Sequence, residues 1–178
     1  MITIFAIDAL EHKLVEEFDS KNLKQDQYGK TDISEFSEPR TMVLWSSFMT
    51  GENKEKEILA KGDKEMWNTK WPTEKTFFSE FDSPKVIDLP GYNYDIDQHH
   101  KQRKLLAQFF NQEDEKEKEA TRQEYNKEAF GHHKEIKEEF LKSLDEDHDF
   151  VLGYFGLAYL VGHLIFGKTS LMKMIYQD

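Results

Sequence analysis

The sequence contains no cysteine, and it has no apolar run long enough to cross a membrane. The first absence excludes disulfides and zinc sites built from thiolates. A secretory signal peptide is not expected either, because the N-terminal apolar run has no basic residues before it and is interrupted by Asp8. We therefore expect a cytoplasmic protein whose first residues form a buried strand.

Positive charge is also scarce. The 178 residues include 24 lysines and arginines against 35 aspartates and glutamates, which gives a formal net charge of -11. An acidic chain repels nucleic-acid backbones and anionic membranes unless a local basic patch intervenes. Nucleic acid polymers and membranes are therefore not expected as partners, whereas a small phosphate ester or nucleotide is compatible because metal ions can supply positive charge. The length suits a single domain over residues 1–178.

Three short apolar segments predict strands. Residues 2–7 and 149–155 are apolar almost throughout, as in strands covered on both faces, and residues 85–90 form a shorter run. The pattern predicts an α/β fold with three layers (αβα) and a mostly parallel central sheet. Ligands of open α/β sheets bind beyond the carboxyl ends of the strands, so Asp8 is well placed to hold a cation. The alternative is that Asp8 caps a helix over residues 9–18.

A helix is predicted to begin at Thr41. Pro39 ends an irregular segment, and apolar residues at helical spacing then continue until Gly51. Backbone N–H groups without intrahelical partners and the positive end of the helix dipole surround the first turn, where they favour an alkoxide or a bound phosphate. This environment suits a nucleophile. The alternative is that Thr41 is an ordinary N-cap.

The middle of the chain is charged and mostly helical in pattern. Residues 52–65 predict an exposed helix, and residues 101–144 predict two or three helices with a break near Gly131. The adjacent histidines 99–100 and 132–133 point about 100° apart on a helix and rarely share a metal, so they predict solvated surface pairs. Residues 167–178 predict a terminal amphipathic helix.

Aromatic residues concentrate between residues 66 and 81. One interpretation is a substrate-facing lid, with residues 52–82 forming a cap or loop insertion. The other is a small satellite core under a long loop. The aromatic residues concerned are Trp67, Trp71, Phe77 and Phe78.

An apolar strand that ends in Asp8, followed by Pro39-Arg-Thr41 opening a helix that runs to Thr50-Gly51, resembles the alkaline phosphatase superfamily, particularly its nucleotide pyrophosphatase/phosphodiesterase branch. The resemblance implies a metal-dependent hydrolase of phosphoric esters. Asp8 and Thr41 would share one divalent metal ion, zinc in the first place and otherwise manganese or magnesium, and Thr41 would attack phosphorus. By the same resemblance, the segment with Tyr92, Asn93 and Asp95 returns to the active-site edge, which makes these residues candidates for substrate binding.

One ligand position departs from the family pattern. Relatives have an aspartate four residues before a Gly-His pair, and that aspartate and the histidine bind the second metal. Here Gly162-His163 is present, but Tyr159 takes the place of the aspartate. Tyrosine is a poor ligand near neutral pH, because its phenol must lose a proton with a reference pKa of about 10. Without the family, His163 would be read as a structurally hydrogen-bonded residue.

The resemblance spans the chain but only the N-terminal part of the family's domain, and further ligands of the family lie beyond that part. It therefore implies an incomplete site that holds metal weakly. The alternative is a catalytically inactive homologue that acts as an interaction or structural module. A truncated parallel sheet would expose an edge strand, which self-association or a partner chain would cover.

Overall fold

The computed structural model describes residues 1–24, 26–27, 29–165 and 169–177. Its contacts divide the chain into two compact units. Unit 1 comprises residues 1–6, 33–100 and 135–154, and unit 2 comprises residues 7–32, 101–134 and 155–178. Residues 52–82 belong entirely to unit 1. A single domain with a cap over these residues stays a prediction.

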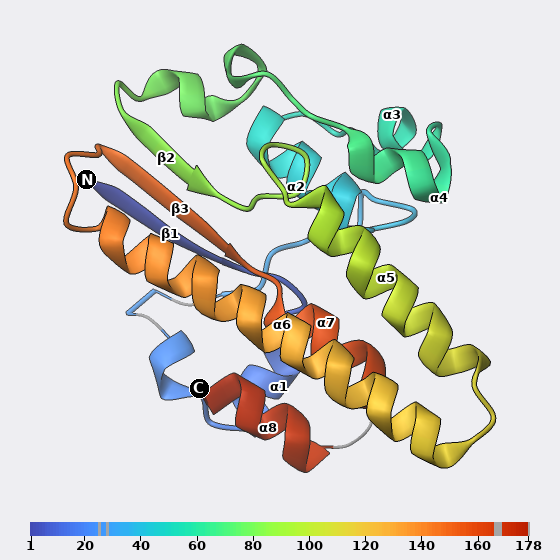
Figure 1. The fold of residues 1–178 in the computed structure, drawn as a ribbon. Coiled ribbons are helices and arrows are strands. Elements are labelled where there is room, and N and C mark those ends of the chain that lie inside the picture. Colours follow the sequence, from blue (N-terminus) through green and yellow to red (C-terminus); the bar gives the residue numbers. More distant parts are fainter. Residues whose placement is uncertain (25, 28, 166–168, 178) are drawn as a thin grey trace. The chain divides into compact units, whose positions relative to one another are not determined.

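A parallel sheet of three strands confirms the predicted α/β class (Figure 1). Its order is β1 (Ile2–Ile7), β3 (Phe150–Phe155) and β2 (Pro84–Ile87). Val86 of β2 lies opposite Leu152 of β3. The strands overlap the three predicted apolar segments, although β2 ends at Ile87 and not at residue 90. All six residues of β3 are buried, as expected for a central parallel strand.

Within unit 1, helices cover both faces of the strands. Helix α2 (Thr41–Thr50) lies on one face, where the Trp45 ring meets the Tyr154 ring edge to face at 5.6 Å. The C-terminal part of α6 (Glu115–Ser143) lies on the other, with Phe140 at 4.6 Å from Phe5. These contacts give unit 1 the predicted three layers. Its core consists of Ala6, Met42, Val43, Met49, Ile58, Met66, Trp71, Phe78, Val86, Leu89, Phe150, Leu152 and Tyr154.

The aromatic segment packs into this same core. It follows the short helices α3 (Glu55–Leu59) and α4 (Gly62–Glu65) and consists mainly of single 3₁₀ turns. Phe78 is fully buried at 5.7 Å from the Phe150 ring, and Phe77 meets the same ring edge to face. The prediction of a separate satellite core is therefore wrong. Phe78 is also inaccessible to a ligand.

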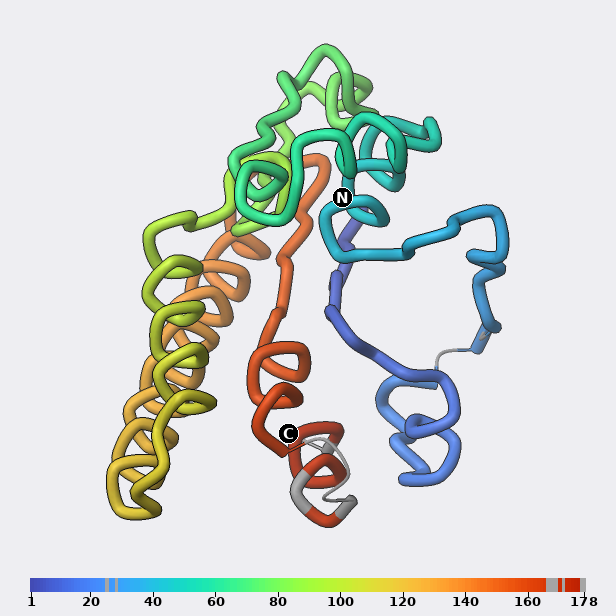
Figure 2. The backbone as a smooth tube through the Cα atoms, turned by 90° about the vertical axis from the view of Figure 1, so that its right-hand side faces the viewer, coloured from blue at the N-terminus to red at the C-terminus, as the bar shows by residue number. Residues whose placement is uncertain are grey.

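Unit 2 is built from helices. They are α1 (His12–Glu17), most of α5 (Ile96–Asn111), the first part of α6, α7 (Leu157–Ile165) and α8 (Thr169–Gln177). In this unit α5 and α6 run side by side and antiparallel (Figure 2), joined by a 2.6 Å ion pair between Lys101 and Glu128. The core consists of Val15, Phe18, Leu105, Leu106, Tyr125, Ala129, Leu157, Ala158, Leu160, Val161, Ile165, Met172 and Tyr176.

Helices α6 and α1 differ from the predictions. Helix α6 continues through Gly131, since a glycine costs only about 1 kcal/mol within a helix and buried residues such as Tyr125 and Phe140 anchor both sides of it. Helix α1 begins at His12 and not at residue 9, because Ala9 has a positive φ of 56°. The terminal helix is described as α8; residues 167, 168 and 178 of the prediction lie outside the described residues.

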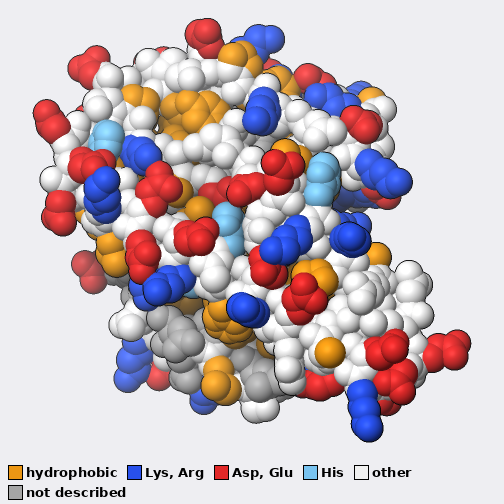
Figure 3. Space-filling model, viewed as in Figure 1, with side chains coloured by type: hydrophobic (Ala, Val, Ile, Leu, Met, Phe, Trp, Pro, Cys, Tyr) orange, Lys and Arg blue, Asp and Glu red, His pale blue; other side chains and the backbone are white. Residues whose placement is uncertain are grey.

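Charged side chains of both signs are interspersed on the face drawn in Figure 3, and they form no continuous basic patch there among the described residues. In the described part of the chain, no helix combines the length and apolar character needed to span a bilayer.

Candidate functional site

Thr41 is the first residue of α2, as predicted from the sequence. Arg40 is the N-cap, with extended backbone and no hydrogen bond from its side chain to the helix end. Thr41 is thus the first helical residue and not the N-cap residue, and a purely structural role for its hydroxyl stays an alternative to a functional one. Its side chain is partly accessible, and it lies among the first N–H groups of a ten-residue helix.

Acidic side chains surround this end of α2. The Arg40 guanidinium forms ion pairs with Asp63 and, at 2.6 Å, with Glu38. The hydrogen bonds to Asp63 and then to Glu38 raise the pKa of Arg40 above its ordinary value. The backbone N–H of Glu38 donates to Glu55 at 2.5 Å. The cation next to Thr41 is thus already engaged by two carboxylates, which opposes the approach of a phosphate.

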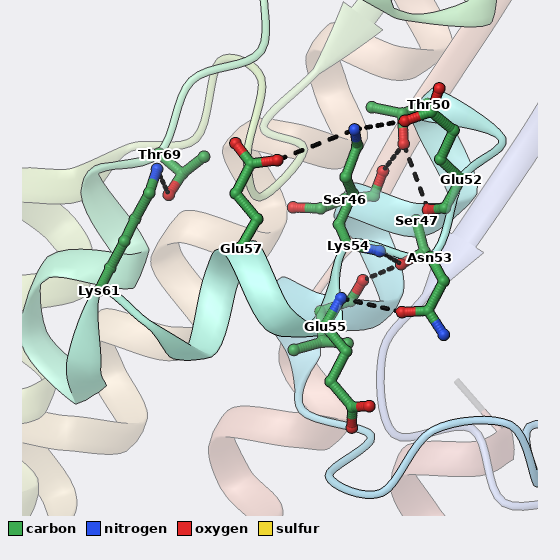
Figure 4. Close-up of polar contacts among 11 residues, drawn as sticks. Ser46, Ser47, Thr50, Glu52, Asn53, Lys54, Glu55, Glu57, Lys61 and Thr69 are labelled. Carbon is green, nitrogen blue, oxygen red and sulfur yellow. Dashed lines mark hydrogen bonds and ion pairs between the residues drawn. The ribbon is translucent and has the colours of Figure 1, made fainter.

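The opposite end of α2 is fixed to the start of α3 (Figure 4). Ser47 Oγ donates to the Val43 carbonyl at 2.8 Å and accepts from the Lys54 backbone N–H at 3.0 Å. Lys54 Nζ pairs with Glu52 at 2.5 Å and lies 4.8 Å from the centre of the Trp71 ring. Gly51 closes the helix in the left-handed conformation at φ 67°. These contacts fix the C-terminal end of the helix that carries Thr41.

Asp8 directly follows β1. Its Oδ1 accepts from the Ala9 N–H at 2.9 Å, and its own N–H donates to the Phe155 carbonyl at 3.1 Å. The side chain of Glu11, not that of Asp8, caps α1 by accepting from the Lys13 N–H. Capping of the next helix is therefore excluded as the role of Asp8. Asp8 belongs to unit 2 and Thr41 to unit 1, so the metal shared between them stays a prediction.

Tyr159 and His163 lie one turn apart on α7, in the same unit as Asp8. Their rings meet edge to face with centroids 4.7 Å apart. Asp8 is near enough to act electrostatically on both side chains, and so is Arg103 of α5. The structure thus places Asp8 within electrostatic range of His163 and of the position at which the resemblance places an aspartate.

The surroundings favour neutral forms of both rings. Burial raises the pKa of the Tyr159 phenol and the negative charge of Asp8 raises it further, with Arg103 opposing. Partial burial lowers the pKa of His163 and the positive charge of Arg103 lowers it further, with Asp8 opposing. A neutral imidazole is the form that binds metal, whereas a phenol with a raised pKa is not a ligand at neutral pH.

The donor set in unit 2 is therefore one carboxylate and one imidazole. Among the described residues, no three histidine, aspartate or glutamate side chains converge as a group that could hold a metal ion. A divalent metal held by Asp8 and His163 stays a prediction; it would have two protein ligands and would need water or substrate to complete its coordination.

The candidate substrate-binding residues have structural hydrogen bonds. Tyr92 shares a 2.8 Å hydrogen bond with Thr73 Oγ1. Asn93 accepts from the Leu89 N–H at 3.0 Å and donates to the Val86 carbonyl at 2.6 Å. Asp95 accepts from the Gln98 N–H at 2.8 Å, at the start of α5. These hydrogen bonds account for the positions of the three side chains without a substrate. A substrate-binding role for them stays a prediction.

Two residues were missed at the sequence level. His99 was predicted to be solvated, but only 4% of it is exposed and its ring stacks on Trp67 at 4.0 Å, so that prediction is wrong for His99. Asp88 is a buried acid directly after β2, with a positive φ of 54°, and its Oδ1 accepts from the Asp95 N–H at 2.8 Å. The signal that could have identified Asp88 is the position of an acidic residue within the apolar segment 85–90.

Comparisons with known protein families, with curated proteins and with solved structures found no significant match to this chain. The likeness to the alkaline phosphatase superfamily therefore rests on the quoted residues alone.

Proposed function

We propose that this chain is a metal-dependent phosphoric ester hydrolase of the phosphodiesterase type, with Thr41 as nucleophile and Asp8 and His163 as metal ligands. The observation that supports the proposal is that Asp8 acts electrostatically on His163 and on Tyr159 in unit 2, the two α7 positions that the resemblance assigns to metal binding. The cytoplasmic location expected from the sequence is part of this proposal.

The metal and each residue of the proposed site have distinct roles in the reaction. A bound metal, with zinc the first choice, would supply positive charge that stabilises an ionised hydroxyl and the phosphate oxygens. The Thr41 oxygen forms a bond to phosphorus as the P–O bond to the leaving alkoxide breaks, and the hydroxyl proton passes to solvent; water then hydrolyses the phospho-Thr41 ester and releases the phosphate product. The N–H groups of the first turn of α2 would stabilise negative charge next to Thr41. The neutral His163 imidazole offers a nitrogen lone pair, and Asp8 offers a carboxylate.

Hydrolysis of bis-p-nitrophenyl phosphate with added Zn²⁺ or Mn²⁺ tests this function. Thr41→Ala should abolish turnover, and Thr31→Ala, a matched change at an exposed position, should leave it intact. Turnover that survives Thr41→Ala would remove Thr41 from the proposed role.

A second candidate is a catalytically inactive homologue that acts by binding. The acidic side chains around Arg40 favour it, since they occupy the cation beside Thr41. The raised pKa of Tyr159 favours it too. This candidate predicts no metal-stimulated turnover by the wild-type chain at any Zn²⁺ or Mn²⁺ concentration.

A further inference from the structure

A serine, a histidine and a glutamate of unit 1 lie in a row where β2 and β3 begin side by side (Figure 1). Ser83 directly precedes β2, and His148 lies two residues before β3. The Ser83 Oγ lies 3.2 Å from His148 Nδ1, and His148 Nε2 lies 3.3 Å from a carboxylate oxygen of Glu146. A hydroxyl, an imidazole and a carboxylate linked in this order are the elements of an activated serine nucleophile.

The Glu146 carboxylate determines where the imidazole proton lies. Hydrogen bonds from His148 and then from Lys142 lower the pKa of Glu146, so this group is an anion at neutral pH. An ionised carboxylate only accepts hydrogen bonds, so it holds the single proton of a neutral imidazole on Nε2. Nδ1 then presents its lone pair to the Ser83 hydroxyl, which is the arrangement that a general base requires.

Two backbone carbonyls compete for the same groups. The Ser83 hydroxyl is also placed to donate to the Asp147 carbonyl at 3.2 Å, and His148 Nδ1 lies 3.2 Å from the Ser83 carbonyl. A proton on Nδ1 would satisfy that carbonyl, but Nε2 would then turn its lone pair toward the Glu146 carboxylate at 3.3 Å. Two acceptors that face each other repel, so a neutral His148 favours the tautomer that activates Ser83.

The segment that carries Ser83 is fixed and partly open to solvent. The Asp149 carboxylate accepts from the backbone N–H groups of Asp82 and Ser83 at 2.8 and 3.0 Å. Ser83 is partly exposed, and 20% of the His148 side chain is exposed. Strands β1 and β3 continue into unit 2 from their carboxyl ends, whereas Ser83 and His148 lie at the amino ends of β2 and β3. The carboxylates in contact with the site, those of Glu146 and Asp149, repel an anionic substrate and favour an uncharged one.

We propose that Ser83, His148 and Glu146 form a second nucleophilic site, which cleaves small, uncharged carboxylic esters. The Ser83 oxygen bonds to the carbonyl carbon while His148 Nδ1 takes the hydroxyl proton, and Nδ1 passes this proton to the leaving alkoxide as the ester C–O bond breaks. Water then attacks the acyl-Ser83 ester and gives a proton to Nδ1, which returns it to the Ser83 oxygen as the carboxylic acid leaves. Glu146 positions the imidazole. The site shares no residue with the proposed phosphoric ester hydrolase.

Hydrolysis of p-nitrophenyl acetate, with the acetylated residue located by mass spectrometry, tests the site. The wild-type chain should release p-nitrophenolate and carry the acetyl group on Ser83. Ser83→Ala should lower the rate at least about tenfold, and Ser37→Ala, a matched change at an exposed position, should leave it unchanged. His148→Gln should slow the acetylation of Ser83 at least about a hundredfold. A wild-type chain without acetyl-Ser83, or a rate unchanged in Ser83→Ala, would overturn the proposal.

Thr41→Ala separates this site from the proposed phosphoric ester hydrolase. It should leave the acetylation of Ser83 unchanged, whereas it should abolish the cleavage of bis-p-nitrophenyl phosphate, an anion that the carboxylates near Ser83 repel. Acetylation of Ser83 that depends on Thr41 would contradict two independent sites.

Nitrogen NMR of the His148 ring tests the proton arrangement without a substrate. At a pH where the ring is neutral, the wild-type chain should carry the proton on Nε2 and leave Nδ1 unprotonated. Glu146→Ala removes the acceptor at Nε2, so the proton should move toward Nδ1, which can donate to the Ser83 carbonyl. Acetylation of Ser83 should slow at least about tenfold in the same variant. A wild-type ring with its proton on Nδ1 would overturn the proposal.

Discussion

The two units are stabilised in different ways. Unit 1 surrounds its strands with aromatic rings. The Phe150 ring, for example, contacts the rings of Phe77, Phe78 and Phe81 at centroid distances of 4.4 to 5.8 Å. Unit 2 packs helices around a mostly aliphatic core, and the Tyr125 hydroxyl donates to the buried Leu160 carbonyl at 2.9 Å. The comparison teaches that one chain can stabilise one compact unit mainly through ring contacts and the other mainly through helix packing and buried hydrogen bonds.

A spectroscopic difference makes the comparison measurable. All three tryptophans, at positions 45, 67 and 71, belong to unit 1. Intrinsic fluorescence therefore follows unit 1, whereas far-ultraviolet circular dichroism follows the helices of both units. Coincident unfolding curves from the two probes would mean that the units unfold together.

The largest expected effect is at Phe150. Phe150→Ala removes a ring that is 1% exposed from the centre of unit 1, and it should lower the free energy of unfolding by about 3–5 kcal/mol. Urea unfolding followed by both tryptophan fluorescence and circular dichroism measures it, so that changes in either unit are detected. Phe110→Ala is the matched control, because 63% of Phe110 is exposed and the change should cost less than about 0.5 kcal/mol. Similar losses in both variants would contradict the assignment of the core.

Tyr125→Phe should have the next largest effect, in unit 2. Loss of the hydroxyl leaves the buried Leu160 carbonyl with one hydrogen bond fewer, which should cost about 1–3 kcal/mol by urea unfolding followed by circular dichroism. Burial raises the pKa of Tyr125, with the charge of Tyr159 adding to it. Stability from this group is therefore present below about pH 10, the unfolded pKa, and is lost as pH rises further.

The loss of stability at alkaline pH distinguishes the contribution of the Tyr125 hydroxyl from that of the packing of its ring. Tyr125→Phe should unfold with a smaller dependence on pH above about 10 than the wild-type chain. An unchanged alkaline dependence would show that Tyr125 is not responsible for it.

The smallest effect is expected at Asp149, in unit 1. Its carboxylate accepts from the N–H groups of Asp82 and Ser83 at 2.8 and 3.0 Å. Burial alone would raise the pKa of Asp149, but these hydrogen bonds outweigh it and hold the pKa below its ordinary value. The contribution is therefore present above about pH 4 and is lost as pH falls through the folded pKa. Asp149→Asn should flatten the acid side of the fluorescence-detected stability curve and leave its alkaline side unchanged.

The sequence predicted unit 1 better than unit 2. Continuous apolar runs identify parallel strands directly, and Gly51 marks the end of α2 because only a left-handed residue closes it there. The length of α6 was not predictable in the same way. Gly131 is a local break signal, and the packing that overrides it involves residues far from it in the chain.

The candidate site was predictable only in part. A strand end and a helix start are sequence-local features, so the positions of Asp8 and Thr41 in their elements followed from the pattern. The approach of Asp8 to α7 joins residues some 150 positions apart, and only the family resemblance suggested it. The burial of His99 depends on a ring from another segment, Trp67, and no periodicity in α5 reveals that contact.

Zinc binding by Tyr159 variants tests the central claim, that Asp8, position 159 and His163 form a metal-ligand cluster. Calorimetric titration with Zn²⁺ should show that Tyr159→Asp binds at least about tenfold more tightly than the wild-type chain. The reason is that the new carboxylate adds a third ligand to Asp8 and His163. Tyr159→Phe should leave the affinity unchanged, and adding His163→Ala to Tyr159→Asp should remove the gain. A Tyr159→Asp chain that binds zinc no better than wild type, or whose gain survives the loss of His163, would contradict the account.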